Sequence, residues 1–408
     1  MKKENLSDAL NHINDDIINE TANTRKLNKK HKSKRIIKSC IAACVVIAIS
    51  ITALTLFPKQ KTNLPPQQDN NITDDVQLPT LTIDTITAGG DGMGFEGLMA
   101  YDISELTNAN PWYEGCDIDT LPVYSNALTF NESYEPTNTN YDKMYEMLYD
   151  IAKQLNLDTD KIEAIQHDNE YHNPFPYLSF EDNGISITIQ ANLTALIDFN
   201  PAISLPGNYN FNAYATYKEM QDVAHYFKDE YKDVIGYKNP QENIFHGDYS
   251  WLDDDSVKQT YNIQFYDKTD DIKQDILNYN FYQIGFHSDY ENEGKLKTVI
   301  IYKPDLSQKI GDYPIVSVDG AKQLLANGNY ITNVPHDFRG LEYIKKTELI
   351  YRISYRAKTY IPYYRFYVEL PENEFATPQG LKHYGFYYVP AVEGKYIENM
   401  PVYDGSFN

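Results

Sequence analysis

PYLSFEDNGISITIQAN, residues 176–192, is the clearest strand pattern in this 408-residue chain. The Asn183-Gly184 pair at its centre is the preferred dipeptide of a two-residue type I′ hairpin turn. A hairpin about this turn gathers the apolar side chains of both arms on one face and leaves serine, threonine and glutamine on the other. The predicted register pairs Phe180 with Ile187 and Leu178 with Ile189, and Ile185 and Ala191 share their face. Since a slip of one residue would destroy this agreement, the segment predicts antiparallel strands in this register.

An amphipathic helix is predicted immediately before this hairpin. Its apolar stripe consists of Met144, Leu148, Ile151 and Leu155. The same order, a helix followed by antiparallel strands, recurs twice later in the chain. We therefore expect an α+β fold with antiparallel sheets. It is arranged as three tandem helix-and-antiparallel-sheet units over residues 82–210, 211–310 and 311–408.

The helix of the second unit is predicted to begin with a capping box. In TYKE, residues 216–219, the threonine hydroxyl and the glutamate carboxylate accept hydrogen bonds from free backbone N–H groups of the first turn. Gly236 is expected to end this helix. Its apolar stripe is Met220, Val223, Ala224, Phe227 and Tyr231. Strands are expected near 259–266, 280–287 and 296–302, the last two joined as a hairpin.

The third unit begins with YPIVSVDGAKQLLANG, residues 313–328. A strand here runs into a short helix that begins at Ser317 or Asp319 and ends at Gly328. ELIYRISYR, YYRFYVEL and HYGFYYVP follow as strands. Their apolar residues alternate, which predicts sheets with one packed face and one face toward water.

A single membrane span is predicted over residues 36–57, IIKSCIAACVVIAISITALTLF. Its uncharged part, from Cys40 to Phe57, is about 27 Å long as a helix, close to the thickness of the bilayer hydrocarbon. Residues 58–81 are polar and rich in proline, which predicts an extended linker. A cleaved signal peptide is disfavoured because the segment before the apolar core is more than 30 residues long.

The charges around the span predict its orientation. Eight lysines and arginines lie between Arg25 and Lys38, whereas only Lys59 and Lys61 follow the span closely. Positive flanks stay in the cytoplasm, so residues 1–35 form a cytoplasmic tail and the C-terminal part lies outside. The whole chain has a net charge of −22, and its acidic excess falls after the span. Such a surface repels phosphate backbones, which excludes nucleic acid as a partner.

The cytoplasmic tail carries a short apolar stripe. Leu6, Leu10, Ile13 and Ile17 recur at steps of four, three and four, as on one face of a helix. The tail offers nothing against which this stripe can pack, so it predicts a partner-binding surface for a cytoplasmic or membrane protein. The alternative is a partly disordered tail, because so short a helix is marginal by itself in water.

The sequence contains no pattern that predicts a catalytic, cofactor or metal site. GGDGMGFEG (89–97) lacks the Lys-Ser/Thr of a phosphate-binding loop. DYENEG (289–294) opens like a calcium loop, but Ile300 stands where its closing glutamate belongs, so a hairpin tip is favoured. The aspartates at 253–255 are better interpreted as a solvated acidic turn. The single cysteine outside the span, Cys116, is expected to be a small buried apolar residue.

Tyrosines crowd the last strands. They suggest either a stacking surface for sugars or peptides, or, as the favoured interpretation, core and cross-strand pairs. The residues concerned are Tyr360, Tyr363, Tyr364, Tyr367, Tyr384, Tyr387 and Tyr388.

Two bacterial groups resemble parts of this chain. LSDALNHINDDIINETA (6–22), followed by KKHKSKR and the span, resembles membrane-anchored anti-sigma-like regulators of Gram-positive bacteria. YPIVSVDGAKQLLANGNY, after the hairpin ending in VIIYKP, resembles PepSY-like regulators of a cell-wall two-component system. The tail has no Cys/His cluster, so the zinc-binding anti-sigma subtype is not supported. Neither resemblance implies an enzyme or a cofactor.

The leading hypothesis is a non-enzymatic, single-pass regulator that binds an unknown extracellular ligand outside the cell and a regulatory protein inside. The alternatives are a surface adhesion or carbohydrate- or peptide-binding module and, less favoured, an anchored cell-wall hydrolase.

Overall fold

The computed structural model describes residues 77–83, 97–131, 135–162, 165–167, 176–251, 256–289, 294–353, 357–371 and 380–406. They belong to one compact unit, residues 75–408. Its fold is α+β, with mainly antiparallel strands and few helices, as predicted. No helix among these residues is long and apolar enough to cross a membrane. The predicted span at 36–57, the tail before it and the linker as far as residue 76 lie outside the described residues.

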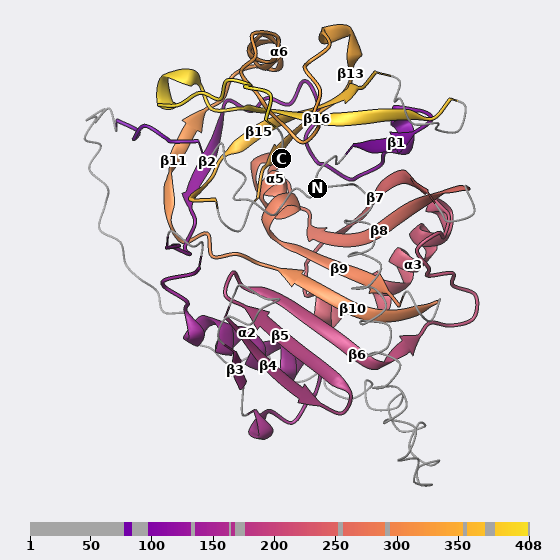
Figure 1. The fold of residues 1–408 in the computed structure, drawn as a ribbon. Helices are drawn as coiled ribbons and strands as arrows, with labels where there is room; N and C mark the ends of the chain where they lie inside the picture. Colours follow the sequence, from indigo (N-terminus) through magenta and orange to yellow (C-terminus); the bar gives the residue numbers. More distant parts are fainter. Residues whose placement is uncertain are drawn as a thin grey trace, which may run out of the picture. The chain divides into compact units, whose positions relative to one another are not determined.

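The largest element is an antiparallel sheet of eight strands (Figure 1). In spatial order they are β3 (Ile165–His167), β4 (Tyr177–Asp182), β5 (Ile185–Gln190), β6 (Thr194–Ser204), β10 (Lys295–Tyr302), β9 (Gln283–Ser288), β8 (Val257–Asp267) and β7 (Pro240–Trp251).

The hairpin of β4 and β5 forms in the predicted register. Phe180 lies opposite Ile187, and Leu178 lies opposite Ile189. Gly184 has φ +78°, and a Cβ there would lie 2.2 Å from the carbonyl oxygen of Asn200. Glycine is therefore required at this turn both by its positive φ and by the close approach of β6.

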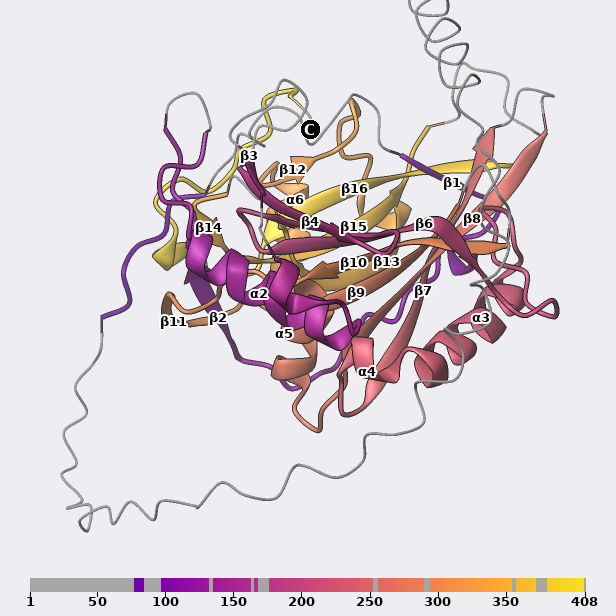
Figure 2. The same cartoon turned by 90° about the horizontal axis from the view of Figure 1, so that it is seen from below.

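Helices α2 (Tyr141–Gln154) and α3 (Tyr217–Glu230) cover the apolar face of this sheet (Figure 2). Their predicted stripes are buried, except that Leu155 and Tyr231, the C-cap residues of α2 and α3, are only partly buried. The predicted capping box is present, since Thr216 and Glu219 each accept a backbone N–H. A one-turn helix, α4 (Lys232–Ile235), ends at Gly236 in the left-handed conformation.

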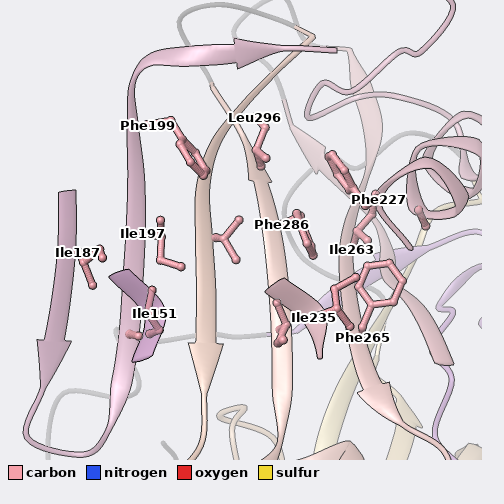
Figure 3. Packing of buried hydrophobic residues seen from close by; sticks show 14 of the residues in the cluster. Ile151, Ile187, Ile197, Phe199, Phe227, Ile235, Ile263, Phe265, Phe286 and Leu296 are labelled. Carbon is pink, nitrogen blue, oxygen red and sulfur yellow. The ribbon is translucent and has the colours of Figure 1, made fainter. Parts of the chain in front are cut away.

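These helices and strands share one buried apolar core (Figure 3). Ile151 of α2, Ile235 of α4 and Phe227 of α3 pack on side chains of the sheet, and Phe227 stacks on Phe286 with ring centroids 4.5 Å apart. The central sheet residues of this core are Ile187, Ile197, Phe199, Ile263, Phe265, Phe286 and Leu296. Burial of this face fixes the register of the sheet, because any slip exposes it.

Two smaller sheets complete the unit. One has five strands: β1 (Leu98–Ala100), β16 (Lys382–Pro390), β15 (Pro362–Glu369) and β13 (Ile344–Tyr351) in this order, with β12 (Ile331–Thr332) also on β16. The other has three: β11 (Lys309–Pro314), β2 (Thr120–Ser125) and β14 (Thr359–Tyr360). Helix α6 (Val318–Ala326) packs on β16 and is capped by Ser317, which settles the two alternatives for its start.

The sheets join segments that lie far apart in the sequence. Strand β6 of the first predicted unit pairs with β10 of the second, so the eight-stranded sheet crosses the predicted boundary at residue 210. Strands β1 and β2, near the start of the unit, pair with β16 and with β11 and β14. The three sequence units therefore share their sheets rather than forming one each.

Two local expectations are wrong. Strand β15 was expected to have one face toward water, but both faces are buried: Tyr363 and Tyr367 on one, Tyr364 and Phe366 on the other. The strand expected from residue 280 begins at Gln283, because residues 272–281 form helix α5 (Ile272–Phe281). From Asp275 onward this helix is buried on every side, asparagines included, so it carries no amphipathic stripe.

The hairpin face provides a stability test. Ile187 is fully buried, whereas Thr188 is half-buried on the opposite face. Ile187→Asp buries an unpaired carboxylate and should lower the free energy of unfolding by on the order of 4 kcal/mol. Thr188→Asp should cost less than about 1 kcal/mol. Urea unfolding followed by circular dichroism measures both losses of stability. Equal losses in the two variants would contradict the burial of the Ile187 face and the partial exposure of the Thr188 face.

Candidate functional site

A cavity of about 330 Å³ lies where the β7–β8 end of the eight-stranded sheet meets the five-stranded sheet. We call it the intersheet cavity. Helix α5 and the loop before β2 complete its wall. Its lining residues are Leu98, Leu106, Thr107, Asn108, Asn243, Phe245, His246, Gln264, Tyr279, Asn280, Gln283, Ile350, Tyr351, Ile353, Arg365, Tyr367 and Phe386.

Arg365 is the only lining residue with a full charge at neutral pH. Alternation along β15 turns it and Tyr367 to the face opposite Tyr364 and Phe366. Its guanidinium carbon lies 5.3 Å from the ring centroid of Tyr367 and 5.1 Å from that of Phe386. Its Nε donates a 3.0 Å hydrogen bond to Glu348 Oε2, and its Nη2 donates to the same oxygen.

Glu348, directly opposite Arg365 in the β13–β15 register, is the most heavily hydrogen-bonded carboxylate of the site. Its Oε1 accepts from Asn108 at 2.6 Å and lies 2.9 Å from Lys346 Nζ, while its Oε2 also accepts from the Tyr367 hydroxyl at 3.0 Å. Burial opposes ionisation, but the charges of Arg365 and Lys346 and the hydrogen bonds outweigh it and lower the pKa of Glu348 to about 2. Glu348 is thus ionised, and with the two cations it forms a cluster of net charge +1.

His246 lies across the cavity on a bulge of β7. The β7–β8 register shifts between His246 and Asp248. His246 has φ +81°, which is unusual for a residue with a side chain. Its carbonyl accepts the Thr107 N–H at 3.0 Å, and a Cβ on Gly247 would lie 2.0 Å from the Glu105 carbonyl oxygen. The loop before β2 therefore holds this bulge in place. Strained positions of this kind concentrate at functional sites.

The imidazole of His246 is neutral near pH 7. Burial lowers its pKa and the positive charge of Arg365 lowers it further, against the opposing effect of Asp248. Its Nδ1 lies 3.6 Å from Asp248 Oδ1, an oxygen that is buried and accepts no hydrogen bond within the described part of the chain.

The remaining polar groups are mostly engaged in holding the wall. The Asn243 side chain accepts the Ala109 N–H at 2.8 Å and donates to Gln264 Oε1 at 3.4 Å. Asn280 accepts the Tyr351 N–H at 3.0 Å and donates to Ile276, fastening α5 to β13. Burial raises the pKa of Tyr279, so its hydroxyl stays protonated beside Arg365.

A second cavity, of about 780 Å³, lies between α2, α4 and the chain after β10. The Lys143–Asp305 ion pair is part of its wall, with further charges of both signs from Glu146, Asp150 and Lys303. Because charges of both signs are spread over its lining, this cavity does not favour a ligand of one particular charge. The intersheet cavity, with one charged lining residue, does.

Most of the sequence-predicted candidates are not placed at either cavity. Leu6, Leu10, Ile13 and Ile17, nearly all of the glycine-rich segment and the aspartates at 253–255 lie outside the described residues. Asp289 and Lys295 close the β9–β10 hairpin, as expected of a hairpin tip. No cluster of three or more metal-ligating side chains occurs within the described ranges.

The tyrosines of the last strands belong to the core, as favoured. Six are buried: Tyr360, Tyr363, Tyr364, Tyr367, Tyr384 and Tyr387; Tyr388 is half-buried. Cys116 is half-buried rather than buried, and its Sγ accepts the Tyr113 N–H at 3.3 Å.

Sequence reasoning missed the residues that define the intersheet cavity. The available signal was a charged residue flanked by apolar and aromatic residues in each of two neighbouring strands, Glu348 in ELIYRISYR and Arg365 in YYRFYVEL. Both were assigned to the face toward water, where a charge needs no partner.

Comparison with known proteins gives no family. No family model matches the chain, and no curated protein matches it. Among solved structures, it is similar to an uncharacterized protein from Eubacterium rectale ATCC 33656, with 17% identity over 70% of this chain and 86% of that chain. The TM-score of 0.29 is too low to carry an argument about fold or function.

Glu348 should make the stability of the protein depend on pH. Its pKa is about 2 in the folded chain and 4.5 as the reference value, so its contribution is complete above pH 4.5 and is lost as the pH falls toward 2. The loss is on the order of 3 kcal/mol, since one pKa unit corresponds to about 1.4 kcal/mol. Glu348→Gln lacks this contribution, so it should be much less stable than wild type at pH 7 and approach wild type near pH 2.

Urea midpoints measured from pH 7 to pH 2 check this. The exposed Glu181→Gln is the matched control and should follow wild type throughout. A constant difference between wild type and Glu348→Gln at every pH would contradict the described cluster.

Proposed function

We propose that this chain is a non-enzymatic, single-pass membrane regulator whose C-terminal part is a ligand-binding sensor outside the cytoplasm. The observation that carries the proposal is the intersheet cavity, where a half-buried guanidinium and a strained histidine line one space from different sheets. A small-molecule site of this kind is concave and largely apolar, with a few polar groups that orient the ligand. The cavity is at the small end of the usual range of such sites.

The position of the cavity supports a sensing role. Its walls come from the β7 bulge and β15, which belong to different sheets, and from helix α5. A ligand that contacts all three stabilises one arrangement of them by its differential affinity for that arrangement. The predicted span at 36–57 then provides the connection to the cytoplasm, and the predicted tail provides the contact with an anti-sigma-like or two-component partner.

The topology of the proposal is tested by protease accessibility. The excess of cations before the span predicts the N-terminus inside and the C-terminus outside. Protease added to intact cells stripped of their wall should therefore digest a C-terminal tag and leave an N-terminal tag intact. Digestion of the N-terminal tag alone would reverse the orientation and end the proposal.

The partner is tested through the tail. If the four-residue stripe binds a protein, each buried side chain contributes roughly 1.5–3 kcal/mol before ordering costs. Replacing Leu10 and Ile13 together by Asp should abolish co-purification of the partner without affecting membrane insertion. The control replaces Asp8 and Asp15 by Asn, which changes charge but preserves the stripe. If both double variants retrieve the same proteins as wild type, the stripe of the tail does not bind a partner.

A surface module that binds carbohydrate or peptide is the second candidate, because tyrosines are exposed near the β7–β8 edge. Tyr101 packs edge-on against Tyr249 at 5.1 Å, and Tyr217 against Tyr261 at 5.7 Å. Tyr214, also exposed, lies beneath Lys258 Nζ at 5.0 Å. Such rings offer flat, amphipathic contact area. A module of this kind has no need of a tail partner, so the co-purification experiment separates the two candidates.

A further inference from the structure

We propose that the intersheet cavity binds a small organic monocarboxylate, held by Arg365 and Gln264 with its apolar part against the phenylalanine and isoleucine side chains of the wall. This inference rests on the proposed function, because it names the ligand class of the same site.

The first argument is the set of hydrogen-bond donors that the protein leaves unused. Arg365 has five N–H donors, and its hydrogen bonds to Glu348 use only Nε and Nη2, both on one oxygen. Its guanidinium also hydrogen-bonds with the Tyr279 side chain, which still leaves part of this five-donor group available. The Gln264 side chain accepts from Asn243, and its Nε2 amide has no acceptor among the described residues. Both side chains are half-buried and line the cavity, so their remaining N–H groups can reach an acceptor ligand there.

The second argument is charge. Arg365 is the one fully charged side chain in the cavity lining, and its partner Glu348, which lies outside the lining, is already saturated by its own hydrogen bonds. With Lys346 these residues form a cluster of net charge +1, which a single carboxylate balances. A phosphate dianion would leave an excess negative charge in a buried site of a protein that is already strongly acidic. The guanidinium geometry also suits the two oxygens of a carboxylate.

The third argument is the character of the rest of the wall. Phe245, Ile350, Ile353 and Phe386 line the cavity together with the polar groups. A carboxylate with a short apolar body therefore fits better than a sugar, whose hydroxyls would meet apolar side chains without partners. The neutral His246 adds no second positive charge at pH 7.

The experiment uses the full chain in detergent, titrated calorimetrically with isovalerate, benzoate and inorganic phosphate, and with isovaleramide and benzamide as uncharged counterparts. The carboxylates should bind saturably and raise the melting temperature, and each amide and phosphate should bind at least tenfold more weakly. Equal binding of a carboxylate and its amide, preference for phosphate, or no binding of either carboxylate would overturn the inference. None of these results affects the topology and tail experiments, which decide the proposed function separately.

Variants localise the binding. Gln264→Glu places a second negative charge in the cavity outside the Glu348 cluster and should weaken isovalerate binding by at least tenfold. Gln323→Glu, an equal charge change on the exposed face of α6, should leave it unchanged. Arg365→Lys keeps the charge beside Glu348 but loses the planar donor pair, and should also weaken binding by at least tenfold. Unchanged affinity in a folded Gln264→Glu variant would place the carboxylate elsewhere and refute the assignment.

Discussion

The ion pair of the buried Glu348 with the half-buried Arg365 is the constraint on which the arrangement of the sheets depends. A buried charge is costly unless it is paired and fully hydrogen-bonded. Glu348 meets this condition only because Asn108, Lys346 and Tyr367 all reach it. The loop before β2 and strands β13 and β15 must therefore lie in one arrangement. Loss of a single partner leaves a buried charge, so the cluster specifies this arrangement more than it adds net stability.

The same loop also fixes the strained part of the cavity. Thr107 donates through its backbone to His246 and through its hydroxyl to Ile244, so the bulge of β7 is held from outside its own sheet. Gly247 permits the close approach of this loop, because any side chain there would meet the Glu105 carbonyl. Asn108 and Thr107 are adjacent in sequence. One short segment therefore contacts both the ion cluster and the bulge, and it holds the two walls of the cavity in position relative to each other.

Helix α5 explains how polar groups are accommodated in the wall of a cavity between packed sheets. Its asparagines are buried, but Asn278 donates to the Asp267 carbonyl and Asn280 bonds with both Tyr351 and Ile276. These bonds replace the water that the amides would otherwise require. The helix can therefore be buried on every side and still carry Tyr279 to the wall of the cavity beside Arg365.

The features that were predictable from the sequence are those that neighbouring residues control. The Asn183-Gly184 turn and the alternation around it gave the β4–β5 register, and the TYKE capping box gave the start of α3, because neighbouring residues decide both. Three features became visible only in the folded chain: Arg365 faces Glu348, β15 is buried on both faces, and residues 272–281 form a helix. Each depends on partners far away in the chain, and a charge in an alternating strand looks the same toward water as toward a buried counter-ion.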